Sequence, residues 1–251
     1  MGQRIGFGID VGGSGIKGGR VDLDTGALIG DRIKILTPQP ATPEAVAKTI
    51  AEIVDIADWK GDIGITIPSV IQNQTALLAA NIDDSWVHTD CQALFTKFLP
   101  NNPAHVLNDA DAAGLAEVQF GDPENKHGAV MLLTFGTGIG SALIHDGLLY
   151  PNSELGHLVI DGIEAEHFAS AKVKEDEGLS FAEWAERVSK VLKVYESLFW
   201  PSKFIVGGGI SREHEKWVSL LTCKTPVIPA SLDNNAGIAG AAFAAEQGLY
   251  P

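Results

Sequence analysis

Two glycine-rich segments, each between two apolar strand-like runs, constrain this chain more than any other feature. The first, IDVGGSGIKGG, runs from Ile9 to Gly19, and the second, LTFGTGIGS, from Leu133 to Ser141. Glycine has no Cβ, so successive backbone N–H groups in such a turn can point toward a bound anion. Two matching turns therefore predict two half-sites for one run of phosphates. The candidate phosphate-binding residues are Asp10, Gly12, Gly13, Ser14, Gly15 and Lys17 in the first segment and Gly136, Thr137, Gly138 and Gly140 in the second.

Other interpretations of these turns compete with phosphate binding. A single glycine turn is also what an ordinary β-hairpin needs. The second turn partly matches the glycine pattern of dinucleotide-binding folds, but that pattern requires a helix after the glycines. Residues 141–147 instead have the pattern of a short strand that ends in a turn, so a phosphate-binding hairpin is favoured. The GxxxxGK[ST] pattern is absent from both segments, which argues against a P-loop nucleotidase.

The charge and composition of the chain narrow the class of protein. The formal net charge is −14, from 18 basic and 32 acidic residues. This charge argues against a nucleic-acid partner, because duplex binding needs a basic surface. The same charge would repel a long polyanion unless basic side chains gather along its path. A hydrophobic content of 45% and 28 glycines fit a compact α/β enzyme with many tight turns.

Further features bear on where the protein acts. No apolar run approaches the roughly 18 residues of a membrane-spanning helix, so no membrane partner is expected. A strand-like run begins at Arg4 and leaves no room for a signal peptide. Cys91 and Cys223 alone form neither a disulfide framework nor a four-cysteine metal site. We expect a cytoplasmic protein.

Local signals predict strands that alternate with helices. Thr42 suits the N-cap of a helix and is followed by proline and an acid. Ser180 and Glu183 form a capping box that opens a long helix, which Trp200 and the next proline end. The apolar face of this helix, within 184–199, predicts either core packing or a dimer contact. The other predicted elements are strands over 64–68, 104–107, 129–133 and 204–206 and helices over 89–98, 109–120 and 236–247.

These elements predict two lobes of α/β structure with no low-complexity linker between them. We place the N-terminal lobe at 1–110, joined by the C-terminal helix at 236–251, and the C-terminal lobe at 111–235. The boundary falls near 108–114, where a helix leaves one sheet for the other. A third glycine turn follows a buried strand in the second lobe, at Gly207-Gly208-Gly209.

Several short motifs follow one another along almost the whole chain. They are DVGGSGIK at 10–17, TPQPATP at 37–43, ANID at 80–83, LNDADAA at 107–113, PNSELGH at 151–157, DG at 161–162, GGGIS at 207–211 and NNAGI at 234–238. In this order they resemble the ROK family (repressors, open reading frames, kinases) of actin-like sugar kinases. Within that family the likeness is greatest to the polyphosphate-using glucokinases.

The resemblance implies both a fold and a reaction. The fold is a two-lobed actin-like ATPase (ribonuclease H-like) fold with the active site in the interlobe cleft. The reaction is Mg²⁺-dependent transfer of the terminal phosphoryl group of inorganic polyphosphate, with ATP as a possible second donor, to the 6-hydroxyl of glucose at the entry to glycolysis. The implied partners are glucose, polyphosphate, ATP and a second copy of the chain in a homodimer.

Asp109 is the candidate catalytic base, because it stands at a strand-to-helix turn from which a side chain can project into a cleft. It also stands where an N-cap residue belongs, and the two roles stay open. Asp10 ends the first strand and is expected to face Mg²⁺ through water, with a turn-forming role as the alternative. Gly207, Gly208 and Gly209 would lie against an adenine if ATP binds.

Paired hydrogen-bond donors and acceptors are expected around the sugar hydroxyls. Glu154 is the strongest candidate, because it follows a proline turn and precedes Gly156. The resemblance also implicates His157, which would hydrogen-bond the sugar, orient Glu154 or serve the fold alone. The full set of candidate glucose-binding residues is Ser69, Asn81, Asn108, Asp109, Glu154, His157 and Glu166.

The chain departs from the family pattern in two places. Most ROK proteins bind zinc through cysteines shortly after this histidine, yet residues 158–170 contain none, so no zinc site is expected. Asp233 stands where arginine is expected in close relatives, so this chain lacks that contact to a phosphate chain. The basic residues that could accompany polyphosphate are Lys190, Lys193, Lys203, Arg212, His214 and Lys216.

Three other functions stay open to test. An ATP-only glucokinase would have the same motifs. A sugar-sensing repressor of this family would carry a helix-turn-helix before the first glycine turn, and only nine residues precede Asp10. A filament-forming actin relative is disfavoured by the sugar-kinase motif ELGH at 154–157.

Overall fold

The computed structural model describes residues 2–79, 82–232, 235–249 and 251. The chain divides into two compact units. The first comprises residues 1–116 together with 235–251, and the second comprises residues 117–234. The C-terminal segment therefore completes the unit in which the chain begins.

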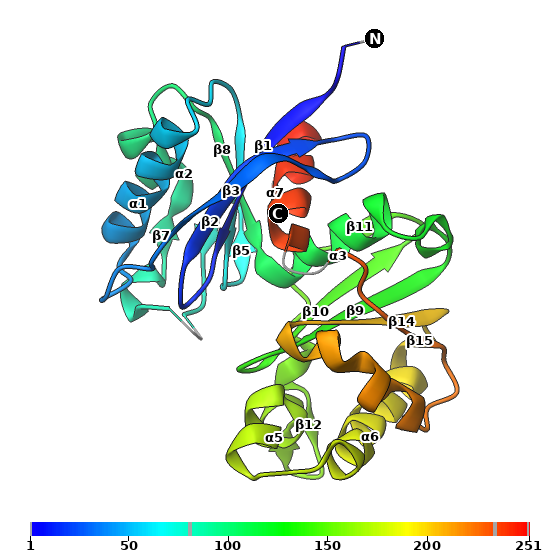
Figure 1. The fold of residues 1–251 in the computed structure, drawn as a ribbon. Helices are drawn as coiled ribbons and strands as arrows, with labels where there is room; N and C mark the ends of the chain where they lie inside the picture. The colour runs from blue at the N-terminus through cyan, green and yellow to red at the C-terminus, as the bar shows by residue number, and fades with distance from the viewer. Residues whose placement is uncertain (1, 80–81, 233–234, 250) are drawn as a thin grey trace. The chain divides into compact units, whose positions relative to one another are not determined.

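The sheet of the first unit has five strands in the order β3-β2-β1-β4-β8 (Figure 1). The strands span Ile5–Val11 (β1), Ile16–Asp22 (β2), Leu28–Ile35 (β3), Ile63–Ile67 (β4) and Ala104–Asn108 (β8). β1, β2 and β3 pair antiparallel, whereas β4 lies parallel to β1 and β8 lies parallel to β4. The carboxyl ends of β1, β4 and β8 consequently share one edge of the sheet.

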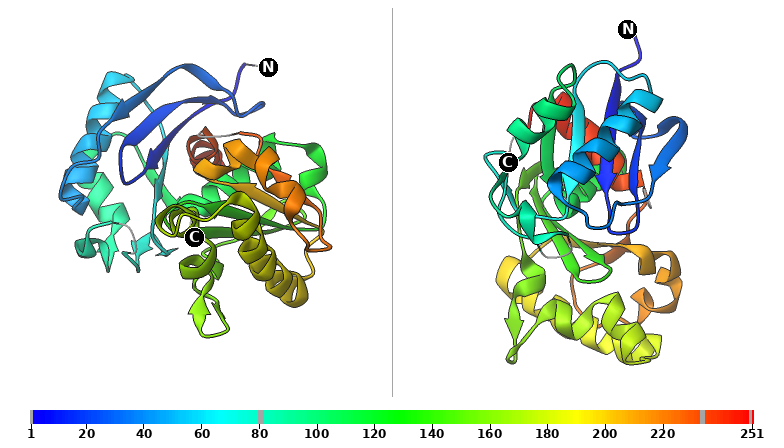
Figure 2. Two further views of the ribbon diagram at one scale, coloured as in Figure 1. Left: turned by 60° about the horizontal axis from the view of Figure 1, so that its bottom comes forward. Right: turned by 90° about the vertical axis from the view of Figure 1, so that its left-hand side faces the viewer.

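Helices cover both faces of this sheet (Figures 1 and 2). α1 (Pro43–Ile56) and α2 (Cys91–Phe98) pack on one face, and α7 (Ala236–Glu246) packs on the other. α7 approaches the strands very closely, since a Cβ at Gly64 would lie 1.8 Å from the carbonyl oxygen of Ala241. Glycine in the strand thus permits the buried alanine-rich helix to pack directly on the backbone.

Smaller elements complete the first unit. α3 (Asp109–Phe120) follows β8 and carries the chain to the boundary of the second unit. The short strands β5 (Ile71–Gln72), β6 (Thr75–Ala76) and β7 (Thr89–Asp90) form a separate three-stranded sheet, beside the 3₁₀ helix η1 (Asp84–Trp86).

The second unit repeats the strand arrangement of the first. Its sheet has the order β11-β10-β9-β14-β15, with β9, β10 and β11 antiparallel and β14 and β15 parallel to β9. The strands span Ala129–Phe135 (β9), Ile139–His145 (β10), Leu148–Tyr150 (β11), Lys203–Gly207 (β14) and Val227–Pro229 (β15). Each glycine turn is thus the loop of an antiparallel hairpin at the centre of its own sheet, as predicted.

The remaining elements of the second unit are short, apart from α6. They are η2 (Pro123–Lys126), η3 (Leu155–His157), the hairpin β12 (Val159–Ile160) and β13 (Ile163–Glu164), α4 (Ala165–Ala169), α5 (Ala171–Asp176), α6 (Phe181–Phe199), η4 (Gly209–Lys216) and η5 (Val218–Leu220). The predicted capping box of α6 is present, because Ser180 and Glu183 hydrogen-bond each other's backbone N–H.

The apolar face of α6 belongs to the core of the second unit. Trp184, Val188, Leu192 and Tyr195 are fully buried in a cluster with apolar residues of β9 and β14. Of the two roles predicted for this face, core packing is therefore the one that the buried residues perform. Three large apolar residues at the C-terminal end of the helix, Leu198, Phe199 and Trp200, stay exposed.

Some helix boundaries differ from the sequence predictions. The second helix begins at Cys91 and not at residue 89, because residues 89–90 pair with β6 and the Asp90 side chain caps the helix by accepting from Ala93 N. The last helix ends at Glu246, one residue earlier than predicted. Asp109 is the first residue of α3, and the cap is the Asn108 side chain, which accepts from the backbone N–H groups of Ala110 and Asp111.

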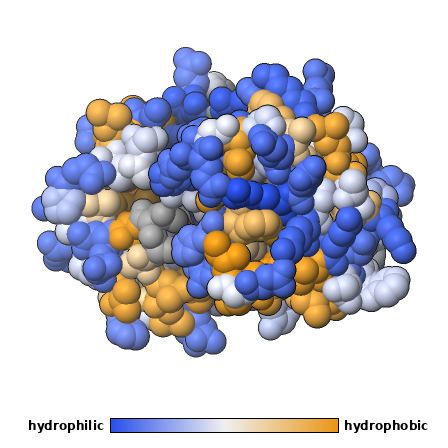
Figure 3. All heavy atoms as spheres, turned by 90° about the horizontal axis from the view of Figure 1, so that it is seen from below, coloured by the Kyte–Doolittle hydropathy of each residue, from blue (hydrophilic) through white to orange (hydrophobic). Residues whose placement is uncertain are grey.

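The length of the helices and the polarity of the surface are both relevant to contact with a membrane. Every helix among the described residues is too short or too polar to cross a lipid bilayer. On the face drawn in Figure 3, hydrophilic side chains predominate and apolar ones form small groups between them. The hydrophilic surface in Figure 3 agrees with the acidic composition of the chain.

Candidate active site

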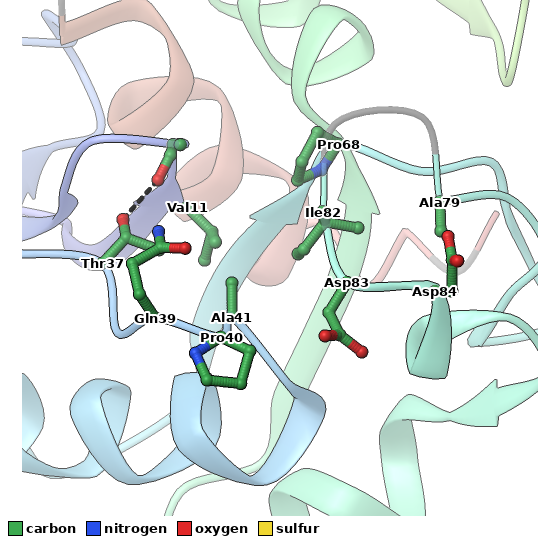
Figure 4. A pocket seen from close by; sticks show the side chains of 12 residues that line it. Val11, Thr37, Gln39, Pro40, Ala41, Pro68, Ala79, Ile82, Asp83 and Asp84 are labelled. Atoms are coloured by element: carbon green, nitrogen blue, oxygen red, sulfur yellow. Dashed lines mark hydrogen bonds between the residues drawn. The ribbon is translucent and has the colours of Figure 1, made fainter.

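The first glycine turn borders an open pocket in the first unit. Gly12 N donates to Gly15 O at 3.2 Å, which closes the turn, and the Thr37 hydroxyl donates to Gly12 O. The pocket has a volume of about 410 Å³. In Figure 4, Thr37 and Gln39 stand on one side of it and Asp83 on the other. Nothing lies within 4 Å of where a Cβ at Gly13 would stand, so the turn is open toward a ligand.

Asp10 and Lys17, both predicted to act on phosphates, bind each other. They are directly opposed in the β1–β2 pairing, and Lys17 Nζ lies 3.0 Å from Asp10 Oδ2. The hydroxyl of Thr66, on the neighbouring strand β4, donates to Asp10 Oδ1 at 3.1 Å. The carboxylate is therefore fixed in orientation at the end of β1, and the lysine charge is balanced locally.

The candidate base follows directly from β8. Asn108 is buried, and its side-chain amide donates to the carbonyl oxygen of Ser69 at 3.1 Å while its oxygen caps α3. Asp109 is exposed at the start of the helix, and its Oδ1 accepts from Ala110 N at 2.9 Å. Asn108 thus fixes the backbone from which the Asp109 carboxylate projects.

Ser69 and Asn81 are two other residues of the first unit that are predicted to bind glucose. Ser69 is buried, and its hydroxyl donates to Leu78 O at 2.6 Å and accepts from Leu78 N. This hydroxyl supports the loop after β4, so it is occupied by backbone groups. Asn81 lies outside the described residues, as does Asp233.

The second glycine turn is bound to two neighbouring segments of the second unit. Gly136 N donates to Gly138 O at 3.0 Å, and Gly136 O accepts from Lys172 N of α5. Glu166 Oε2 accepts from Ile139 N at 3.3 Å, immediately after the turn. A Cβ at Gly138 would lie 2.3 Å from the same carboxylate oxygen, so a side chain here would displace the Glu166 carboxylate.

The segment that carries Glu154 is anchored to β10 and α6. The Ser141 hydroxyl donates to Ser153 O at 2.6 Å and accepts from Leu155 N, and Tyr195 donates to Leu155 O. Burial raises the pKa of the Glu154 carboxyl, an effect that the nearby His157 opposes and the charge of Glu166 reinforces. The backbone on both sides of Glu154 is thus anchored, and its carboxyl group keeps its proton to a higher pH than an exposed glutamate does.

His157 lies among three carboxylates. Its Nδ1 is 3.0 Å from Glu164 Oε2 and 3.7 Å from Glu166 Oε1, and its Nε2 is 3.9 Å from Glu154 Oε2. The hydrogen bond to Glu164 is the main cause of a raised His157 pKa, against which partial burial acts. The same bond lowers the pKa of Glu164. Glu164, which the sequence analysis did not single out, comes from the β12–β13 hairpin.

The group formed by His157 and its neighbouring carboxylates also bears on metal binding. His157, Glu164 and Glu166 each offer a donor atom, and these atoms lie within 4.8 Å of one another. The group contains no thiolate and so differs from a cysteine zinc cluster. Its closest pair is already joined by a hydrogen bond. The absence of a zinc site stays a prediction.

The third glycine turn opens a second pocket, of about 660 Å³, within the second unit. Gly208 has φ +86°, and a Cβ there would lie 2.3 Å from Phe135 O, so this position requires glycine. The residues that line the pocket are Phe135, Gly136, Thr137, Ala171, Lys172, Lys174, Glu175, Phe181, Gly209, Ile210, Arg212 and Glu213. The second and third glycine turns thus share one pocket. Its basic residues are Arg212, which is among those expected to accompany polyphosphate, and Lys172 and Lys174, which no sequence motif indicates.

Comparisons with known proteins agree with this geometry. The chain is 57% identical over 242 residues to a polyphosphate glucokinase of Mycobacterium tuberculosis (strain CDC 1551 / Oshkosh). The aligned region covers 96% of this chain and 91% of that protein. The crystal structure of the inorganic polyphosphate/ATP-glucomannokinase of Arthrobacter sp. strain KM matches with a TM-score of 0.92 and 46% identity, over 99% of this chain and 100% of the other.

A more distant structure shows the same fold. A ROK family glucokinase of Streptomyces griseus, solved with glucose and AMPPNP, matches with a TM-score of 0.79 and 27% identity, over 98% of this chain and 100% of the other. Together with the paired mixed sheets, these matches establish the predicted α/β actin-like fold. Residues 6–171 match the sequence model of the ROK family, so this chain belongs to the ROK family.

Proposed function

We propose that this protein is a polyphosphate-dependent glucokinase. It transfers the terminal phosphoryl group of inorganic polyphosphate to the 6-hydroxyl of glucose and yields glucose 6-phosphate; ATP serves as a second donor. The observation that supports this most is the 57% identity to a polyphosphate glucokinase over nearly the whole chain. The name of the Arthrobacter enzyme supports two donors, since it includes both polyphosphate and ATP.

Asp109 is the proposed base of this reaction. As the bond between the glucose O6 and phosphorus forms, the bridging P–O bond of the donor breaks, and the O6 proton passes to the Asp109 carboxylate. The exposed position of Asp109 at the start of α3 supports this role. Such transfer depends on positioning and charge neutralisation more than on covalent catalysis. The backbone N–H groups of the two glycine turns supply part of that neutralisation.

The proposed sugar contacts come mainly from the second unit. Glu154 and Glu166 offer carboxylate oxygens to the hydroxyls, and His157 offers an imidazole nitrogen. Their mutual proximity in one cluster supports this grouping. Asn81 and the side-chain amide of Asn108 complete the proposed set. Ser69 contributes indirectly, because its hydroxyl supports the loop whose Ser69 carbonyl oxygen accepts from the Asn108 amide.

A divalent cation, which we propose to be Mg²⁺, accompanies the phosphates. Mg²⁺ is usually held by one or two carboxylates, several waters and substrate phosphates, and it neutralises phosphoryl charge in such reactions. Asp10 fits a water-mediated contact, because Lys17 and Thr66 orient its carboxylate while each oxygen retains a lone pair. Direct coordination would compete with the Lys17 ion pair.

A donor comparison tests the proposed function. Purified protein would be supplied with glucose and Mg²⁺ and with either long-chain polyphosphate or ATP, and glucose 6-phosphate would be measured. We expect turnover with both donors and a higher kcat/KM with polyphosphate. Turnover with ATP alone would identify an ATP-only glucokinase, and turnover with neither donor would reject the proposal. Mannose as acceptor tests selectivity at the 2-hydroxyl, and chelation by EDTA should abolish activity until Mg²⁺ is restored.

The proposal extends to assembly and location. We propose a homodimer that acts in the cytoplasm. Both cysteines, Cys91 and Cys223, are free, which suits a reducing compartment. The exposed apolar residues at the end of α6 lie near those of β11, since Tyr150 and Phe199 line one small groove. This surface supports contact with a second copy.

A further inference from the structure

An acidic protein that uses polyphosphate needs unbalanced positive charge beside the donor. Many of the basic side chains are neutralised by carboxylates within 4.0 Å. They are Arg4, Lys17, Lys60, Lys97, Lys172, Arg187, Lys190 and Lys216. A phosphate chain gains most from cations that have no such partner.

Three of the basic residues expected along a polyphosphate path contact other groups of the protein. Lys190 pairs with Asp161 at 2.6 Å, and Lys203 donates to Glu124 O and Asn125 Oδ1 at 3.0 Å each. A third, Lys216, pairs with Glu213. These side chains already contact other groups, so they offer less unbalanced charge to a polyanion than an unpaired cation does.

Lys174 and Arg212 differ from these residues. Both line the 660 Å³ pocket that also contains Gly136 and Thr137 of the second glycine turn. Within the part of the chain that the structure describes, neither has a carboxylate oxygen within the 4.0 Å ion-pair distance. Lys174 Nζ lies 4.3 Å from the centre of the Phe181 ring, a contact that holds the ammonium at the pocket wall without cancelling its charge.

The pocket wall is fixed relative to the glycine turn. Lys172 N, at the start of α5, donates to Gly136 O at 3.0 Å. Two residues later, the same helix carries Lys174, while Arg212 lies in η4, which follows the third glycine turn. The wall also carries two acidic residues: Glu213, which is bound to Lys216, and Glu175, so the three basic residues outnumber the acidic ones by one. Two segments therefore bring positive charge to one pocket beside the turn.

We infer that the polyphosphate chain behind the transferred phosphate lies along the wall formed by Lys174 and Arg212. This inference rests on the proposed function and names the donor subsite within it. The terminal phosphate is held by the N–H groups of the glycine turn, and following phosphates contact the two cations. Because polyphosphate carries charge on every unit whereas ATP ends in a nucleoside, these residues favour the inorganic donor.

The test compares the variants Lys174→Gln, Arg212→Gln and their double combination with wild type. The double variant Lys126→Gln/Lys224→Gln is the matched control, because it removes the same charge from the same unit outside the pocket. At low ionic strength each single change should raise KM for long-chain polyphosphate roughly three- to tenfold, and the double change roughly tenfold or more. KM for glucose should stay unchanged, and KM for ATP should rise less.

Two further readouts separate this inference from the proposed function. Binding of long-chain polyphosphate to the protein without glucose, measured by calorimetry, should weaken in the double variant and depend less on salt. Equal polyphosphate affinity of wild type and double variant would overturn the inference, whether or not wild type shows turnover. An equal loss in the control double variant would also overturn it, since the effect would then follow net charge alone. Failure of wild type to phosphorylate glucose would instead reject the proposed function.

Discussion

Asp109, the proposed base, is the first residue of α3. Its carboxylate is exposed and accepts a hydrogen bond from Ala110 N, while the cap of α3 comes from the buried Asn108. Replacing Asp109 by asparagine removes the charge and keeps an oxygen that can accept from Ala110 N, so this change tests the proposed base.

Asp109→Asn should lower kcat for glucose phosphorylation by about 10²–10⁴-fold, the usual contribution of a positioned base. The amide oxygen can still accept from Ala110 N, so the thermal midpoint should change little. Steady-state kinetics and a melting curve check both statements. Asp90→Asn is the control, because Asp90 caps α2 through a similar hydrogen bond. Wild-type turnover in Asp109→Asn would show that the base is another group.

Glu164 sets the protonation of His157. The raised His157 pKa means that the imidazolium persists in the folded protein above the unfolded midpoint of about 6.5. Its contribution to stability is therefore complete below that pH and is lost as pH rises through the folded pKa. Both side chains are more than a third exposed, so solvent screening keeps this contribution small.

Glu164→Gln should move the His157 titration midpoint to lower pH, because the largest cause of the raised pKa is removed. The midpoint can be followed through the imidazole carbon resonance in an NMR titration. Glu166→Gln should move it less, since Glu166 Oε1 is 3.7 Å away and not hydrogen-bonded to the ring. An unchanged midpoint in Glu164→Gln would mean that the pair is open in solution.

At the scale of elements, hydrogen bonds within the second unit join the second glycine turn to the segment that bears Glu154. Glu166 binds the backbone just after the second glycine turn, and Lys172 N of α5 binds Gly136 O. Strand β10, which leaves that turn, holds residues 153–155 through Ser141. The second glycine turn and the segment bearing Glu154 are therefore parts of one hydrogen-bonded structure.

Ser141→Ala should destabilise the protein by about 1–3 kcal/mol, because it leaves buried backbone partners at Ser153 and Leu155 unsatisfied. It should also raise KM for glucose, since Glu154 lies between those residues. Chemical denaturation and kinetics give the two values. Ser197→Ala, which removes an exposed hydroxyl bonded within α6, should change neither. A stable Ser141→Ala variant with normal KM would contradict the anchoring role.

At the scale of the whole molecule, exposed apolar residues favour self-association. Leu148 and Tyr150 of the edge strand β11 are 77% and 70% exposed, and Trp200 is 82% exposed. A free strand edge next to apolar side chains invites pairing with another chain. The buried face of α6, by contrast, is used within the unit and leaves no surface for a partner.

The double change Leu148→Glu/Leu198→Glu should convert the proposed homodimer to a monomer, because it places charge on the apolar surface near β11 and the end of α6. Light scattering should then report 26.5 kDa in place of twice that mass. Ile56, an apolar residue on α1, is as exposed as Leu198, so Ile56→Glu is the control and should leave the dimer intact. A monomeric wild type would reject the dimer.

Local patterns sufficed for much of the architecture. The glycine hairpins, the Thr42 cap, the Ser180–Glu183 capping box and the order of strands and helices depend on neighbouring residues, whose propensities and hydrogen bonds act over a few positions. The family was identified for a related reason, because its motifs are short and occur in a characteristic order. The family match to residues 6–171 confirms that identification.

Contacts between distant segments decided the rest. The Asp10–Lys17 ion pair depends on strand register, the occupation of the Ser69 hydroxyl on a returning loop, and the Glu164–His157 bond on a hairpin too short to predict. The basic pocket wall likewise joins α5 to η4, segments that are far apart in the chain. The sequence alone thus determined the elements and the family. The partner of each charged or polar group was decided only by tertiary packing, because that partner is set by spatial distance and not by sequence separation.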